Sequence, residues 1–84
     1  MPEISRFYGI VIKMYFQKSE HNPPHIHAFY QDNIVAISIK DLTILSGGFP
    51  NTALRLVCEW IELHKEELLK MWNTQEFKEI EPLN

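Results

Sequence analysis

The sequence predicts an α+β fold: a meander of three to four antiparallel strands with one long C-terminal α-helix packed on one face of the sheet. The first half alternates apolar and polar side chains at the period of a strand and is interrupted by turn residues. The second half repeats its apolar residues at the period of a helix. We expect residues 1–84 to form a single domain, because so short a chain cannot build a second core.

Four segments rich in β-branched and aromatic residues are predicted to be strands: residues 7–16, 25–30, 34–40 and, shorter, 42–45. In the first segment the even-numbered residues are apolar and are expected to face the core. The connection over residues 17–24 is polar and ends in Pro23 and Pro24, which restrict the backbone before the second strand.

One helix is expected from Pro50 to about Trp72. Its predicted core stripe, flanked by Trp60 and Met71, consists of Leu54, Val57, Cys58, Ile61, Leu68 and Trp72. Leu56 and Leu63 lie beside the stripe and would either widen the core or form a contact patch for another chain, including a second copy in a homo-oligomer. The tail is expected to return to the sheet through Phe77, Ile80 and Leu83.

Composition limits the classes of function. The formal net charge of −3 argues against a broad nucleic-acid-binding surface, which is normally basic. The single cysteine, Cys58, excludes an intrachain disulfide framework and a cysteine-based zinc cluster. No apolar run is long enough to span a bilayer, and the N-terminal residues do not resemble a secretory signal. We therefore expect a cytoplasmic protein without a membrane partner.

The segment from Glu20 to His27 (EHNPPHIH) contains three of the four histidines. Because side chains alternate along a strand, His25 and His27 are expected to share a face, with Ile26 and Ala28 on the other. The face of the sheet away from the helix is then predicted to carry Lys13, Tyr15, His25, His27, Phe29, Ser38 and Lys40.

Three functions are compatible with this face. In the first, His25 and His27 are the acid and base of a metal-free cleavage of RNA, while Lys13 and Tyr15 contact phosphate. No cofactor is needed for this chemistry.

In the second, His21, His25 and His27 bind a divalent transition metal such as Zn, with Glu20 as an alternative ligand. In the third, the histidines have structural roles and the exposed face binds a protein without catalysis.

The order of the segments resembles a bacterial family of domains of unknown function, number 4160. The resemblance covers nearly the whole chain, and its most specific part is Glu20-His21-Asn22-Pro23-Pro24-His25-Ile26-His27; further matching segments are Gly48-Phe49-Pro50 and Val57-Cys58-Glu59-Trp60-Ile61. The resemblance implies no established activity. It does imply a small cognate protein encoded nearby, in an arrangement similar to a toxin–antitoxin pair, which favours both the protein-binding function and the RNA-cleavage function.

Overall fold

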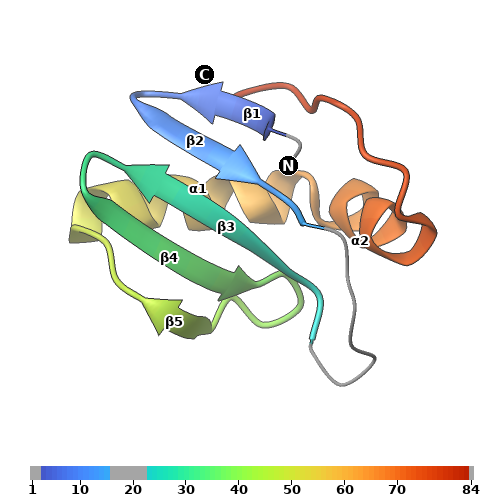
Figure 1. The fold of residues 1–84 in the computed structure, drawn as a ribbon, viewed down its shortest axis with the longest axis horizontal. Coiled ribbons are helices and arrows are strands. Elements are labelled where there is room, and N and C mark those ends of the chain that lie inside the picture. The colour runs from blue at the N-terminus through green and yellow to red at the C-terminus, as the bar shows by residue number, and fades with distance from the viewer. Residues whose placement is uncertain (1–2, 16–22, 84) are drawn as a thin grey trace.

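The computed structural model describes residues 3–15 and 23–83. Five antiparallel strands form one sheet in the order β1-β2-β3-β4-β5, and two helices follow (Figure 1). The elements are β1 (Glu3–Phe7), β2 (Ile10–Lys13), β3 (His25–Tyr30), β4 (Asn33–Ser38), β5 (Ile44–Gly47), α1 (Asn51–Leu63) and α2 (Lys65–Thr74). The predicted α+β class is confirmed, whereas the predicted strand number and the single helix are wrong in detail.

The first predicted strand, residues 7–16, contains only the last residue of β1, which was otherwise not predicted, and then β2 after a tight turn. Tyr8 and Gly9 both have positive φ, 52° and 80°, which is the backbone conformation of a two-residue hairpin. Tyr8 is consequently exposed and does not face the core as expected, whereas Ile10 and Ile12 are buried as predicted.

The third and fourth predicted strands are displaced by one or two residues. β4 ends at Ser38, because the chain turns there: the Leu42 N–H donates to the Ser38 carbonyl at 3.0 Å, and Leu42 has a φ of 60°. The same turn delays the start of β5 to Ile44. β3 has the predicted bounds.

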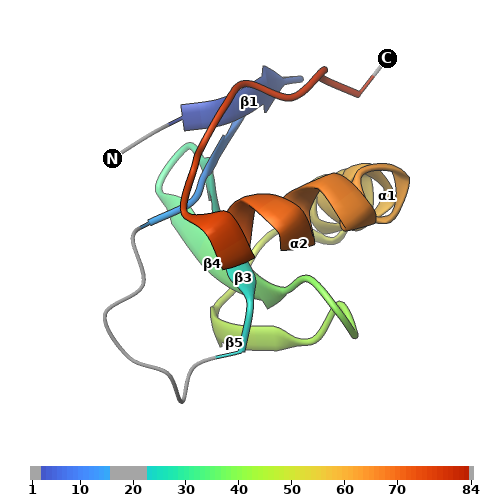
Figure 2. The same ribbon diagram turned by 90° about the vertical axis from the view of Figure 1, so that its right-hand side faces the viewer.

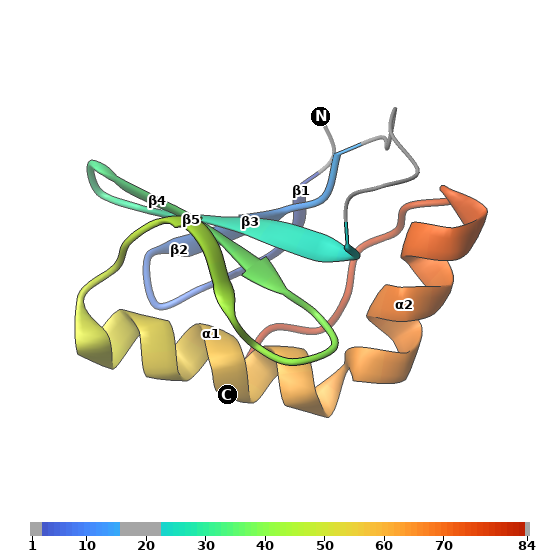
Figure 3. The same ribbon diagram turned by 90° about the horizontal axis from the view of Figure 1, so that it is seen from below.

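The predicted long helix is interrupted at His64. This residue has φ −118° and ψ 19°, and its N–H lies 3.2 Å from the carbonyls of both Trp60 and Ile61. The chain therefore changes direction, and α2 leaves the line of α1 and rises beside the start of β3 (Figure 3).

The core lies between the sheet and α1. Trp60 was expected at the flank of the helical stripe but is fully buried, with its ring 5.7 Å from that of Phe7. Cys58 and Leu54, expected on the stripe, are only half-buried. Burying the largest side chain removes the most apolar area from water, which favours this rotation of the helix. Leu63 is 66% exposed.

The C-terminal segment returns to the sheet as predicted and runs beside β1 (Figure 2). The Ile80 N–H donates to the Ile4 carbonyl at 2.7 Å, and the Trp60 indole N–H donates to the Glu81 carbonyl at 2.9 Å. Ile80 is buried, and Phe77 and Leu83 pack against the core. This segment therefore covers one edge of the sheet.

Candidate functional site

The face of the sheet opposite α1 carries most of the side chains that the alternation predicted. Ile26 and Ala28 of β3 are fully buried in the core, and the two histidines between and beside them point the other way. Across β2 and β3, Lys13 pairs with His27, which places both on this second face. We call Lys13, Tyr15, His25, His27 and Phe29 the histidine face.

Ring contacts join the members of the histidine face. The centroids of the His25 and His27 rings are 5.1 Å apart, and those of Tyr15 and His27 are 4.7 Å apart at a nearly perpendicular angle of 86°. The Lys13 ammonium lies 4.9 Å from the centroid of the Phe29 ring, a cation–π contact. The four residues that were predicted to be catalytic therefore lie together: Lys13, Tyr15, His25 and His27.

The two prolines before β3 orient His25. The Nδ1 atom of His25 lies 2.9 Å from the Pro23 carbonyl oxygen. A carbonyl can only accept, so Nδ1 carries the hydrogen and the neutral ring has its lone pair on Nε2. The Pro24 carbonyl accepts from the Ile39 N–H at 2.9 Å, which anchors the same turn to β4.

A helix reaches the edge of the histidine face, contrary to the expectation that no helix would touch it. The Trp72 ring of α2 lies 5.0 Å from the His25 ring. This contact exists because the chain turns at His64, so that α2 no longer continues along the opposite side of the sheet. His25 is thus held between Trp72 and His27.

His27 is half-buried on the histidine face. Partial burial lowers the pKa of its ring, and His25 lowers that pKa further. Its Nδ1 atom is buried and has no hydrogen-bond partner in the described part of the chain. His27 is therefore a neutral imidazole near pH 7.

A hollow of about 180 Å³ opens between the histidines and β5. Its lining residues are Pro23, His25, His27, Ala36, Leu45 and Ser46. The sequence did not predict Leu45 and Ser46 as part of the site, because only the pairing of β4 with β5 brings them to His27. Ala36 of β4 lies opposite His27 of β3 in the sheet.

Ser38 and Lys40 were expected as exposed members of this face. Ser38 is buried, and its hydroxyl donates to the Asp41 carboxylate at 2.6 Å, because β4 ends in a turn there. Lys40 is exposed but lies beyond the end of β4, and its carbonyl accepts from the Lys65 ammonium at 2.6 Å. Neither residue belongs to the ring cluster.

The predicted metal site is described only in part. His21 and Glu20 lie outside the described residues, and within residues 3–15 and 23–83 no three histidine, cysteine or acidic side chains gather as a metal site. His25 and His27 provide two neighbouring imidazoles. Cys58 is remote from them in the helix, and burial together with Glu62 raises the pKa of its thiol, which makes it a weak nucleophile.

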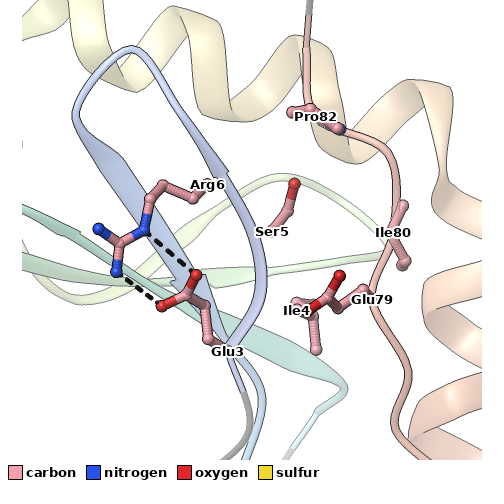
Figure 4. A pocket seen from close by; sticks show the side chains of 7 residues that line it. All are labelled: Glu3, Ile4, Ser5, Arg6, Glu79, Ile80 and Pro82. Atoms are coloured by element: carbon pink, nitrogen blue, oxygen red, sulfur yellow. Dashed lines mark hydrogen bonds and ion pairs between the residues drawn. The ribbon is translucent and has the colours of Figure 1, made fainter.

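A second hollow lies between β1 and the C-terminal segment (Figure 4). Its charged residues include Arg6 and Glu3, whose side chains are 2.8 Å apart; the hydrogen bond from Arg6 holds the pKa of Glu3 below its usual value. The buried Ser5 hydroxyl has no partner among the described residues. Since the ion pair satisfies its own charges, this hollow offers less chemistry than the histidine face.

The fold and the histidine face together define a small α+β domain with a paired-imidazole surface. The family model described as "Domain of unknown function (DUF4160)" matches residues 9–73, and the chain belongs to this family. The resemblance noted from the sequence is thereby confirmed, and the matched range includes the histidine face. No curated protein and no solved structure matches the chain. Within the described residues, no helix is both long and apolar enough to cross a membrane.

Proposed function

We propose that the protein is the toxin-like component of a two-protein module and that its histidine face cleaves RNA by metal-free acid–base chemistry. The observation that carries the proposal is the contact between the two imidazoles, whose centroids are 5.1 Å apart beside an open hollow. A small cognate protein encoded nearby is the proposed partner, which would hold the toxin inactive.

The environments of the two rings suggest their roles. His27 is neutral near pH 7 because its pKa is lowered, so it is the general base; Nε2, the ring nitrogen other than the buried Nδ1, would take the proton from a ribose 2′-hydroxyl. The 2′-oxygen then forms a bond to the adjacent phosphorus, and the bond from phosphorus to the 5′-oxygen breaks. His25, whose Nδ1–H is held by the Pro23 carbonyl, donates the Nε2 proton of its charged form to the leaving 5′-oxygen.

Two neighbours of the histidines suit the charge that develops on the phosphate. Lys13 lies opposite His27 in the sheet and supplies a positive charge, which stabilises the additional negative charge of the transition state. The Tyr15 ring lies 4.7 Å from the His27 ring and nearly perpendicular to it, and its hydroxyl would donate a hydrogen bond to a phosphate oxygen. Local positive charge from Lys13 offsets the unfavourable net charge of the chain for RNA binding.

The purified, tag-free protein tests this chemistry directly. We expect cleavage of a fluorescent RNA oligonucleotide in the presence of EDTA, and no cleavage of the same sequence with 2′-deoxyribose. His25→Ala and His27→Ala should each reduce the rate by about 10²-fold or more, the usual contribution of a general acid or base. His64→Gln is the matched control, because His64 lies at the junction of the helices. Equal cleavage of the deoxy substrate, or full activity of the double variant, would contradict the proposal.

A growth experiment tests the role in the module. Expression of the chain without its neighbour should slow growth and degrade cellular RNA, and co-expression of the neighbour should restore both. If growth is normal and the double histidine variant behaves as the wild type, the toxin proposal is wrong. Histidine variants that stay folded but no longer capture the neighbour in a pull-down would instead indicate a non-catalytic interaction module.

Metal binding is a second candidate function, favoured by one specific observation. The hydrogen bond from Nδ1 of His25 to a backbone carbonyl is the usual outer contact of a metal-binding histidine, and it leaves Nε2 as the ligand atom. His27 would be the second ligand and His21 the third, with Zn as the expected metal. Elemental analysis of tag-free protein should find a metal, and added Zn or Ni should raise the melting temperature. Absence of both effects would exclude this candidate.

A further inference from the structure

The two edges of the sheet differ in how they are covered. Along β1, the C-terminal segment forms a backbone hydrogen bond at Ile4 and is anchored by the Trp60 indole. At the other edge (Figure 1), β5 pairs with β4 alone within residues 3–15 and 23–83. All four residues of β5 are exposed. The outer side of β5 therefore presents unpaired backbone groups to solvent.

The side chains of β5 do not protect this edge. Ile44, Leu45, Ser46 and Gly47 include no charge and no proline, the residues that usually prevent edge-to-edge pairing. Ile44 and Leu45 are 47% and 43% exposed, and Ile34 on the adjoining β4 is 52% exposed. Three of the five large apolar side chains that are exposed in the described part of the chain thus lie on β4 and β5. A bulge in the pairing of β4 with β5 twists the edge locally but adds no charge to it.

We propose that β5 pairs with β5 of a second copy of this chain, antiparallel and about a two-fold axis, to form one continuous sheet through both subunits. A two-fold axis brings each strand against its own sequence, and residues 44–47 tolerate this because no like charges meet. The covered β1 edge explains why the assembly would end at two chains: the sheet of the described residues has one open edge in each subunit, and the proposed pairing uses it.

This interface is small, because a four-residue strand contributes most of it. It falls below the standard interface of about 1,600 Å². We therefore expect a reversible dimer with a dissociation constant on the order of micromolar rather than a permanent one.

Pairing through β5 places the two histidine faces on the same side of the joined sheet, because a two-fold axis between antiparallel neighbours is perpendicular to the sheet. Leu45 and Ser46 line the hollow beside His27 and also belong to the pairing strand. The dimer would therefore present two hollows side by side, flanking its axis. This inference does not depend on RNA cleavage, since it rests on the edge of the sheet alone.

Sedimentation equilibrium of the full chain over a range of concentrations tests the inference. The wild type should fit a monomer–dimer equilibrium, and Leu45→Lys should be monomeric throughout, because it places like charges on both sides of the axis. Leu63→Lys is the matched control: Leu63 is equally apolar and even more exposed, at 66%, but lies at the end of α1, so the dimer should persist.

Circular dichroism shows whether each variant keeps its fold, and Ile44→Lys provides the same readout if Leu45→Lys does not. A wild type that is monomeric at every concentration overturns the inference. A dimer that survives both β5 variants, or one that Leu63→Lys abolishes, overturns it as well.

Discussion

Replacing Gly47 by alanine tests how β5 is held against β4. Gly47 has a φ of +75°, and a Cβ atom built there would lie 2.0 Å from the Ile34 carbonyl oxygen and 3.2 Å from the Val35 Cα. Non-bonded heavy atoms are most stable at about 3.5–4.0 Å, so β5 would have to move away from β4 by roughly 1.5 Å. That movement breaks the hydrogen bond from the Gly48 N–H to Ile34, now 3.2 Å long.

The expected loss of stability follows from these two effects. Alanine in the left-handed region costs about 1–2 kcal/mol, and the lost backbone hydrogen bond costs about 1 kcal/mol more. A total of about 2–3 kcal/mol lowers the melting temperature of a domain of this size by about 8 °C or more. Urea and thermal unfolding, followed by circular dichroism, measure both quantities.

The other two glycines separate the contributions. Gly48→Ala should change stability by less than about 0.5 kcal/mol, because nothing lies within 4 Å of its Cβ position. Gly9→Ala should show the backbone cost alone, since its φ is +80° but its Cβ would meet only the Tyr30 ring, at 3.5 Å. If Gly47→Ala is no more destabilising than Gly9→Ala, the close contact between β4 and β5 is wrong.

Three further predictions concern single side chains. Because the pKa of His27 is lowered in the folded state, the unfolded chain binds more protons than the folded chain between that pKa and 6.5. The free energy of unfolding should therefore fall as the pH drops through this range. His27→Gln should flatten this pH dependence, which urea titration measures. An unchanged slope in the variant would contradict the burial of this ring. Trp60→Phe should lose the hydrogen bond to the Glu81 carbonyl and destabilise the fold by about 1–2 kcal/mol. The C-terminal segment should then be cleaved more readily in limited proteolysis. A digestion pattern like that of the wild type would refute the anchoring role of Trp60. The raised pKa of Cys58 should make its thiol react more slowly with Ellman's reagent in the folded than in the urea-unfolded protein, and equal rates would contradict its half-buried position.

Local patterns in the sequence were sufficient to predict the strand that carries the two histidines and the direction of its side chains. The alternation along residues 25–30 placed Ile26 in the core and both histidines on the opposite face, because side-chain direction in a strand depends only on position parity. The same parity failed at Tyr8 and Gly9. Apolar residues continue on both sides of that turn, so the pattern does not reveal that the chain reverses there.

The interruption of the helix at His64 is a second feature that the apolar pattern did not predict. The apolar period of the helix continues from Ile61 to Leu68, so no local signal separates α1 from α2. The change of direction at His64 becomes understandable only from packing: Trp60 is buried against Phe7, and Trp72 must reach the edge of the sheet beside His25.

The amino-acid sequence by itself determined the class of the fold, the family and the shared direction of His25 and His27, since all three depend on local order along the chain. Only the tertiary structure decided what surrounds those rings. The Trp72 contact, the wall of the hollow at Leu45 and the open edge at β5 join residues far apart in sequence, and their meeting depends on packing and strand pairing that local periodicity does not encode.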